Sequence, residues 1–387
     1  MHSPSGARRI ESLTGLRIVA AVLVYLSHVG VPPGVNPRAV TFAAAGYNGV
    51  TVFFVLSGFV LAWNYADRFS TLTGRALWSF AVARVARIYP LYLVALLWVV
   101  APALVTHTLP ASTWWHVAAL QTWSSDMSFA LALNGPGWSI GVELFLYACF
   151  PALMLAIYRI RSRPSVLLGL AVVATAVVIA LAWWFVASGR DALPWADAES
   201  AHRWLYRNPL ARLGDFVVGI SVALLARAVQ VKAWIGATAQ AVGAVAFLVL
   251  MTWPSLLHTA WSWDAAYLLP AALVIWGLAA SPETPLARLL STKPMILAGE
   301  ASFAFYLLHG PLVARLTLGP VETWLGWLFT TGLLFAMIMF AAVGAHLVIE
   351  RPAQQWIRRT FDRRRPEAIA SPPPVATREP EPEKALV

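Results

Sequence analysis

Charged residues and cysteine are scarce in this chain of 387 residues. Charged side chains make up 12% of it, whereas a soluble domain carries about 25%, which excludes an ordinary soluble globular protein. The single cysteine, Cys149, excludes a disulfide framework or a cysteine-based metal site within one chain. Five histidines have no ligand-like spacing and predict no metal site: His107, His116, His202, His258 and His346.

Several recognition motifs are also missing. The sequence has no Gly-rich phosphate loop, no Walker motif and no G-x-S-x-G turn. The formal net charge of +10 comes from Lys and Arg that are spread among the connections between apolar runs. That distribution predicts no nucleic-acid partner and indicates membrane topology instead. We expect no cleavable signal peptide, because the first apolar run is too long and no clear small-residue cleavage site follows it.

Apolar residues, by contrast, make up 59% of the chain, and tryptophan occurs 19 times. Tryptophan favours the membrane interface, and runs long enough to span a bilayer recur about ten times. We therefore expect an all-α fold, a polytopic transmembrane helical bundle of about ten spans in a lipid bilayer. The expected spans are Leu16–Val31, Tyr47–Tyr65, Ile88–Val105, Trp138–Tyr158, Val166–Ala187, Leu210–Leu225, Ala233–Trp253, Ala265–Ala280, Ser302–Leu318 and Trp324–Ile349.

Basic residues predict the orientation of these spans. With a cytoplasmic N-terminus, the outer connections 108–137 and 254–263 contain no Lys or Arg. The outer connection 189–209 is the exception, because it contains three arginines beside three carboxylates. Both termini are therefore expected in the cytoplasm. The expected division is a cytoplasmic segment 1–12, a transmembrane domain 13–352 and a largely disordered cytoplasmic tail 353–387, rich in Pro and Glu.

Two basic side chains lie within the first apolar run. Arg17 and His28 are eleven residues apart, roughly 16 Å along a helix, which is about half of a hydrocarbon core. An ionisable group inside a membrane costs roughly 2.5–3.5 kcal/mol on insertion scales, so that its presence requires a reason. The alternative is that Arg17 follows the positive-inside rule and His28 caps an interfacial turn.

Glu143 lies about two turns inside the fourth span, after a Gly- and Pro-rich entry. If that span runs inward, Glu143 and His28 are at comparable depth near the outer ends of their helices. We expect the two residues to form a functional His–Glu pair, because intramembrane ionisable groups are functional by default. A purely structural ion pair is the alternative.

Arg84 and Arg87 lie at the entrance of the third span, three residues apart on one helical face. Two guanidinium groups in that arrangement suit a phosphorylated ligand, because arginine binds phosphate through two parallel hydrogen bonds. The alternative is anchoring by the positive-inside rule together with contacts to lipid headgroups.

Three further polar residues are candidates for a pocket. Ser57 interrupts the second span within FFVLSGFVL, and Tyr306 and His309 lie one turn apart within SFAFYLLHGP. Each of them could instead serve helix packing. The sequence IERP at 349–352 is expected to form an interfacial ion pair and a helix stop.

The order of these motifs resembles that of the acyltransferase-3 family of integral-membrane O-acyltransferases. Arg17, ten residues and His28 come first, followed by FFVLSGFVL, RVARIYPLY, WSIGVELFLYACFP, SFAFYLLHGP and IERP. The resemblance covers residues 8–352, and the ordered set makes it specific. Thr14 and Ile140 depart mildly from the Asp and Leu that members often have there.

The resemblance implies an enzyme that moves a short acyl group from acyl-CoA, a co-substrate rather than a bound cofactor, to a hydroxyl of a small acceptor. His28 would be the general base and Glu143 would orient or stabilise its imidazole. Arg17, Arg84 and Arg87 would hold the CoA phosphates. An acyl-His28 intermediate remains open, as does the oligomeric state.

The chain's length and composition resemble those of antibiotic-tailoring members such as macrolide 3-O-acyltransferases. The expected acceptor is therefore a sugar, a glycoside or a macrolide antibiotic, and the expected location is the bacterial cytoplasmic membrane. A proton-coupled transporter using His28, Glu143 and His309 is the main alternative, and a structural membrane protein is the third. Paired broken spans in two similar halves would favour transport, and the sequence shows no such symmetry.

Overall fold

The structure of the chain is a computed structural model that describes residues 10–32, 36–316 and 323–361. In those ranges the chain is helical and has no strand, which confirms the all-α expectation. Ten helices occupy the ten expected spans: α1 (Glu11–Leu26), α3 (Gly49–Tyr65), α4 (Gly74–Val105), α7 (Trp138–Tyr158), α8 (Pro164–Ala187), α9 (Leu213–Ala228), α10 (Ala233–Met251), α11 (Ala265–Ala280), α14 (Ser302–Arg315) and α15 (Trp324–Ala345). Shorter helices lie between them, α2 (Pro37–Ala44), α5 (Thr113–Val117), α6 (Met127–Ala130), α12 (Pro285–Leu290) and α13 (Lys293–Glu300), and α16 (Arg351–Phe361) follows the last of them.

The lengths of these helices support a multi-pass membrane protein. Within the described residues, 6 helices are long and apolar enough to cross a membrane, and the pair α13 and α14, bent by 61°, would make a seventh. Helices α1, α9 and α11 have 16 residues each, about 24 Å at 1.5 Å per residue, which is shorter than a hydrocarbon core of about 30 Å. The expectation of about ten spans therefore holds for the positions of the helices, whereas length supports six or seven.

Helix α4 begins fourteen residues before the expected third span, at Gly74. The Thr73 side chain caps it by accepting a hydrogen bond from the backbone N–H of Ala76, which satisfies one of the free donors at a helix start. Arg84 and Arg87 are consequently about three turns inside a helix of 32 residues. The sequence placed them at the entrance of the expected span, and the structure shows that this entrance lies inside a longer helix.

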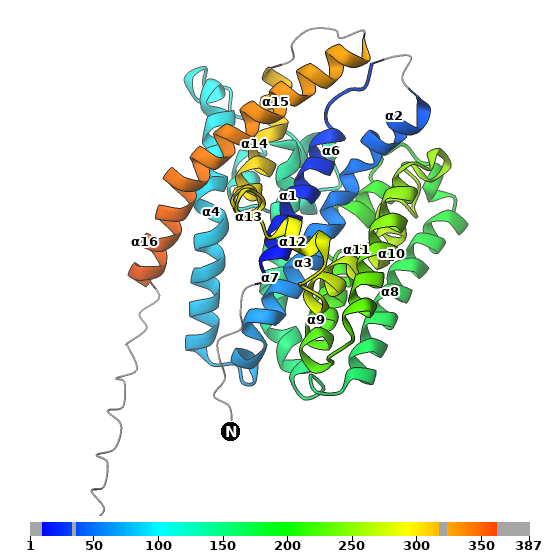
Figure 1. Ribbon diagram of the computed structural model, residues 1–387. Helices are drawn as coiled ribbons and strands as arrows, with labels where there is room; N and C mark the ends of the chain where they lie inside the picture. Colours follow the sequence, from blue (N-terminus) through cyan, green and yellow to red (C-terminus); the bar gives the residue numbers. More distant parts are fainter. Residues whose placement is uncertain (1–9, 33–35, 317–322, 362–387) are drawn as a thin grey trace, which may run out of the picture.

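The connections gather at two ends of the bundle, which we call the cap end and the basic end; they lie at the top and the bottom of Figure 1. The cap end contains residues 106–137, 188–212 and 252–264, where Thr122 Oγ1 donates to the Arg207 carbonyl over 2.8 Å. At the basic end, Asp67 after α3 forms ion pairs with Arg161 after α7 (3.6 Å) and Arg227 at the end of α9 (2.6 Å). Successive connections thus alternate between the two ends.

Two of the three arginines of the connection 189–209 have partners within the protein, while the buried guanidinium of Arg207 has no hydrogen-bond partner among the described residues. Arg190 forms an ion pair with Glu199, and Arg203 Nη2 donates to the carbonyl of Trp123 over 2.8 Å. Their place at the cap end therefore has a local structural reason, which explains why this connection departs from the charge pattern of the others.

Helices α1 and α3 run through the middle of the bundle, with α8 to α11 on one side and α4, α14 and α15 on the other (Figure 1). Helix α3 crosses α9 closely at two glycines. A Cβ atom at Gly58 would lie 2.2 Å from the carbonyl oxygen of Phe216, and one at Gly219 would lie 2.1 Å from that of Val55. The glycine in FFVLSGFVL therefore serves helix packing, as small residues often do between membrane helices.

Helix α15 continues through a π-helical turn, His346–Glu350, into the amphipathic helix α16. Pro352 is the second residue of α16 and directly follows the π-helical turn, an irregular part of a helix of the kind where prolines and kinks occur. The expected helix stop at IERP is therefore wrong, and the ordered chain extends beyond residue 352. At the basic end, Trp78 Nε1 of α4 donates to the carbonyl of Phe361 over 3.0 Å; residues 362–387 of the expected tail lie outside the described residues.

Candidate active site

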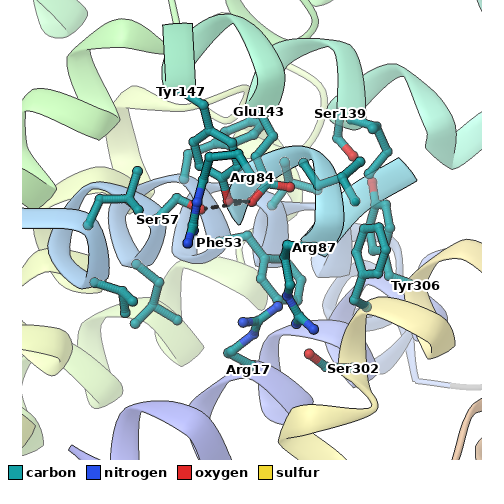
Figure 2. A pocket seen from close by; sticks show the side chains of 18 residues that line it. Arg17, Phe53, Ser57, Arg84, Arg87, Ser139, Glu143, Tyr147, Ser302 and Tyr306 are labelled. Atoms are coloured by element: carbon teal, nitrogen blue, oxygen red, sulfur yellow. Dashed lines mark hydrogen bonds between the residues drawn. The ribbon is translucent and has the colours of Figure 1, made fainter. Parts of the chain in front are cut away.

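A cavity of about 100 Å³ lies between α1, α3, α4, α7 and α14. Figure 2 shows the 18 side chains that line it, and six of them are residues predicted from the sequence: Arg17, Ser57, Arg84, Arg87, Glu143 and Tyr306. These residues come from five helices and are up to 289 positions apart in the chain (306 − 17). We call this space the arginine cavity. Two other predicted residues, His28 and His309, are not part of its lining.

Arg84 enters the arginine cavity between aromatic rings. Its Nη2 donates to the hydroxyl of Tyr65 over 3.2 Å, and its guanidinium carbon lies 5.5 Å from the centre of the Tyr147 ring. Aromatic faces attract a cation without using its hydrogen-bond donors. Most of the donors of Arg84 are therefore available to a ligand with anionic oxygens.

Arg87, one turn further along α4, has an acidic partner that its sequence position did not suggest. It forms an ion pair with Glu350, which is 1% exposed and lies in the π-helical turn after α15. His346 Nδ1 lies 3.0 Å from the other oxygen of the same carboxylate. Glu350 thus pairs with Arg87 on α4 and is buried, whereas the sequence had predicted an interfacial ion pair within IERP.

Glu143 lies about one and a half turns from the start of α7 and faces the arginine cavity (Figure 2). Its carboxylate accepts a hydrogen bond from Ser57 Oγ over 3.2 Å and a second one from the hydroxyl of Tyr147. Glu143 therefore places a carboxylate in a cavity that three arginines also line.

His28 and His309 contact each other at the cap end. His28 is exposed and lies in the turn after α1, while His309 is fully buried in α14. Their ring centres are 4.8 Å apart in an edge-to-face arrangement. The ring of His309 also lies 5.5 Å from that of Tyr306, which lines the arginine cavity. A row of three rings thus connects the cavity with the exposed imidazole.

Hydrogen bonds to backbone carbonyls determine the tautomer of both imidazoles. His28 Nδ1 lies 2.8 Å from the carbonyl oxygen of Val24, and His309 Nδ1 lies 2.6 Å from that of Tyr306. Because a carbonyl only accepts, each Nδ1 carries the proton and each neutral ring has its lone pair on Nε2. His309 Nε2 is buried and has no hydrogen-bond partner in the described part of the chain. Both rings are therefore able to accept a proton.

The structure does not form the expected pair between His28 and Glu143. The carboxylate is held by Ser57 and Tyr147, whereas the imidazole contacts Val24 and His309. The physical reason is that α1 ends at Leu26, so that His28 lies beyond the helix, while Glu143 turns inward toward α3. The two ionisable groups lie at different places along the path between the cap end and the arginine cavity.

One buried charge cluster was not anticipated from the sequence. Arg212 is fully buried and forms ion pairs with Asp215 (3.0 Å) and Asp264 (2.7 Å). It also donates to the carbonyls of Tyr206 and Trp263, over 2.9 and 2.7 Å. Arg212 and Asp215 have i,i+3 spacing, which was a usable signal, but Asp264 comes from a distant connection. These contacts tie the cap connections to α9, a structural role.

Comparison with known proteins defines the class to which this site belongs. The acyltransferase domain model of the acyltransferase-3 family matches residues 10–346. The chain therefore belongs to this family, and the class of enzyme is an O-acyltransferase, as its motifs predicted.

Three relatives illustrate the match. Acyltransferase MdmB of Streptomyces mycarofaciens is 31% identical over 396 residues, 96% of this chain and 97% of that protein. A putative O-acetyltransferase of Staphylococcus aureus strain COL is 22% identical over 79% of this chain, and O-acetyltransferase OatA of strain NCTC 8325 is 22% identical over 81%. The chain spans 51% of the length of each staphylococcal relative. No solved structure matches the chain.

Proposed function

We propose that the protein transfers a short acyl group from acyl-CoA to a hydroxyl of a small acceptor within the bacterial cytoplasmic membrane. The observation that carries this proposal is the arginine cavity, in which three guanidinium groups from α1 and α4 converge inside an apolar bundle. Burying three cations is costly unless anions accompany them. Two carboxylates, Glu143 and Glu350, contribute negative charge beside these arginines, and the phosphates of CoA would be further anionic ligands for the guanidinium groups.

The donor enters from the basic end, because α4 and α14 both begin there and carry the lining residues inward. Arg17, Arg84 and Arg87 bind the phosphates, and arginine suits this role through its paired donors. The acyl-pantetheine arm then extends toward Ser139 and Tyr306, which line the opposite part of the cavity. The thioester is thereby brought toward the row of rings that ends at His28.

His28 acts as the general base. Its Nε2 takes the proton of the acceptor hydroxyl while that oxygen attacks the thioester carbonyl carbon. The C–O bond forms, the C–S bond breaks, and the CoA thiolate leaves and takes up the proton from the imidazolium. His309, with its own free Nε2, is the second candidate for this proton. Direct transfer needs no covalent enzyme intermediate.

Glu143 acts on the donor side of the reaction in this proposal. Its contacts with Ser57 and Tyr147 hold it in the wall of the arginine cavity, where it balances the arginines when no donor is bound. It is therefore a positioning residue for the arginines and the arm, rather than the partner of the His28 imidazole.

The acceptor reaches His28 from the cap end, where this imidazole is exposed. We propose a sugar, a glycoside or a macrolide antibiotic, each of which offers a hydroxyl on a bulky molecule. The similarity to acyltransferase MdmB along 96% of the chain supports acyl transfer as the reaction. We further propose ten spans with both termini in the cytoplasm, because both ends of the described chain, Ile10 and Phe361, lie at the basic end.

Membranes containing the protein, incubated with radiolabelled acetyl-CoA and candidate alcohols, test this proposal. We expect labelled ester and free CoA in equal amounts, and neither in membranes without the protein. Movement of an alcohol across sealed membranes without ester formation would instead favour the transporter. A metabolite comparison between a deletion strain and its parent would identify the natural acceptor by the loss of one acyl group.

A further inference from the structure

A second cavity, of about 430 Å³, lies at the basic end beside the arginine cavity. It is lined by residues from α1, α3, α4, α13 and α16 and from the π-helical turn before α16. Arg17, Val60 and Arg87 line both cavities, so that the two spaces meet at these side chains. We call the second space the entry cavity. None of the predicted pocket residues other than the two arginines belongs to it.

The two cavities differ in size, as do the two parts of a CoA thioester, its thin acyl-pantetheine arm and its bulky nucleotide. The arginine cavity, at about 100 Å³, is narrow and has mainly apolar walls, which suits a thin pantetheine chain. The entry cavity, at about 430 Å³, falls in the range of roughly 300–1,000 Å³ that is usual for small-molecule sites. Of these two cavities, the entry cavity is the one with room for a nucleotide.

The lining of the entry cavity has the chemistry that a phosphorylated adenosine requires. Trp63 lines it and stacks on Phe59 with ring centres 5.7 Å apart, a platform on which a purine can stack. Arg351, in the first turn of α16, also lines it, and its exposed guanidinium forms no hydrogen bond or ion pair within the described ranges. The amide nitrogen of Asn64 donates a hydrogen bond to the carbonyl oxygen of Val60 over 2.7 Å. The amide oxygen of Asn64 is therefore available to accept a hydrogen bond from a ligand.

The charged residues that line the entry cavity also suit a phosphorylated ligand. Arg17, Arg87 and Arg351 line the entry cavity with a single carboxylate, Glu300, so that the lining has an excess of positive charge whichever form His346 takes. The ion pair with Glu350 holds Arg87 at the junction of the two cavities. An anion with two separate phosphate positions, one at the junction and one beside α16, matches this distribution.

We infer that the entry cavity binds the adenosine 3′,5′-bisphosphate part of acyl-CoA, with the purine on Trp63 and the 3′-phosphate at Arg351. The diphosphate bridge then lies at Arg17 and Arg87, where the pantetheine arm passes into the arginine cavity. This inference rests on the proposed use of acyl-CoA. It assigns donor recognition to α16, a helix that lies beyond the residues matched by the family model.

Free adenosine 3′,5′-bisphosphate is the probe, because it contains the nucleotide without the thioester arm. Its equilibrium binding to the purified full chain is measured in lipid nanodiscs, together with its inhibition of acyl transfer. We expect inhibition competitive with acyl-CoA. Arg351→Gln and Trp63→Leu should each weaken its binding by about tenfold or more, as expected for one lost charge-assisted contact or one lost stacking partner.

Matched variants serve as controls. Arg358→Gln and Trp356→Leu lie on the exposed surface of α16 and do not line the entry cavity, so nucleotide binding should be unchanged. Trp63→Phe keeps an aromatic face and should retain most of the affinity, which separates stacking from a folding defect. Unchanged binding in both Arg351→Gln and Trp63→Leu, with normal unfolding temperatures, would overturn the inference.

Two further readouts separate a nucleotide subsite from a lipid site and from a failure of the proposed function. A lipid headgroup would present the same phosphate chemistry, so nanodiscs with and without phosphatidylglycerol are compared; nucleotide affinity that disappears in the anionic lipid would assign the cavity to lipid and overturn the inference. If ester forms from acyl-CoA while the variants bind nucleotide normally, the entry cavity is not the subsite although the proposed function stands. If the nucleotide binds as expected but no acyl-CoA supports transfer, the proposed function fails by itself.

Discussion

Arg84 and Arg87 lie one turn apart on α4, but their side chains have different contacts. Arg84 is surrounded by the aromatic rings of Tyr65 and Tyr147, whereas Arg87 is tied to the buried carboxylate of Glu350. The sequence predicted their shared face and their place in a site, and the structure brings both into the arginine cavity. The sequence could not reveal Glu350 as the partner of Arg87, because 263 residues separate the two (350 − 87) and no local pattern relates them.

Replacing Arg84 should weaken donor binding specifically. In Arg84→Gln we expect the KM for acyl-CoA to rise by about tenfold or more, the equivalent of one charge-assisted hydrogen bond, with an unchanged KM for the acceptor. Arg84→Lys should restore part of the affinity, because a single ammonium lacks the paired donors of arginine. Steady-state kinetics with each substrate varied in turn measures both values. A change confined to the acceptor KM would place Arg84 in a different site.

Removing Glu350 should affect stability as well as activity. In Glu350→Ala the half-buried Arg87 loses its ion pair, which costs about 3 kcal/mol in the free energy of unfolding when a buried pair is broken. Thermal unfolding in detergent should therefore occur at a lower temperature than for Glu283→Ala, a carboxylate on an exposed connection. Bound CoA should offset part of the loss by supplying another anion to Arg87. An unfolding temperature equal to that of the wild type would show that the pair contributes nothing to the fold.

Helix positions followed from hydrophobic runs, but helix ends and crossings did not. Each expected span contains a helix because length and polarity alone decide where apolar segments lie in a membrane. The early start of α4 and the continuation of α15 into α16 escaped prediction, since both extensions contain several arginines and are not purely apolar. Crossings such as that of α3 over α9 depend on two glycines that are 161 residues apart (219 − 58). Their meeting is a tertiary event with no local signature.

The α3–α9 crossing should tolerate no added side chain. In Gly58→Ala the new Cβ would lie 2.2 Å from the carbonyl oxygen of Phe216, so that the two helices must move apart at a cost of about 1–3 kcal/mol. Because Ser57 is the adjacent residue and bonds to Glu143, activity should fall along with stability. Gly169→Ala, where nothing lies near the added atom, is the matched control and should unfold like the wild type. Equal stability of the two variants would show that the crossing is looser than described.

The whole molecule has two chemically different ends joined by a polar path. The basic end contains the ion pairs of Arg161 and Arg227 with Asp67, the entry cavity and both ends of the described chain. The exposed imidazole of His28 is at the cap end. Composition and loop charge predicted this polarity, and the ordered motifs predicted six of the residues that line the arginine cavity. The relation between His28 and Glu143 could not be predicted, because equal depth in two helices does not determine which way their side chains face.

Reporter fusions test the proposed orientation of the molecule. Fusions after Arg163 and after Arg359 should give a cytoplasmic signal, because basic connections are retained inside. A fusion near Ser125, in a connection without Lys or Arg, should give an external signal. A cytoplasmic signal at Ser125 would overturn the proposed topology and the entry of the donor from the cytoplasm.

Turnover per folded molecule in His28→Ala tests the central claim most directly. The purified variant and the wild type are compared with labelled acyl-CoA and an alcohol acceptor, with the folded fraction determined by size exclusion and thermal unfolding. Loss of the general base should lower kcat by about 10²–10⁴-fold while nucleotide binding is retained, and His309→Ala shows whether the neighbouring ring shares the role. If His28→Ala instead turned over at nearly the wild-type rate per folded molecule, the imidazole at the cap end would not be the catalytic base.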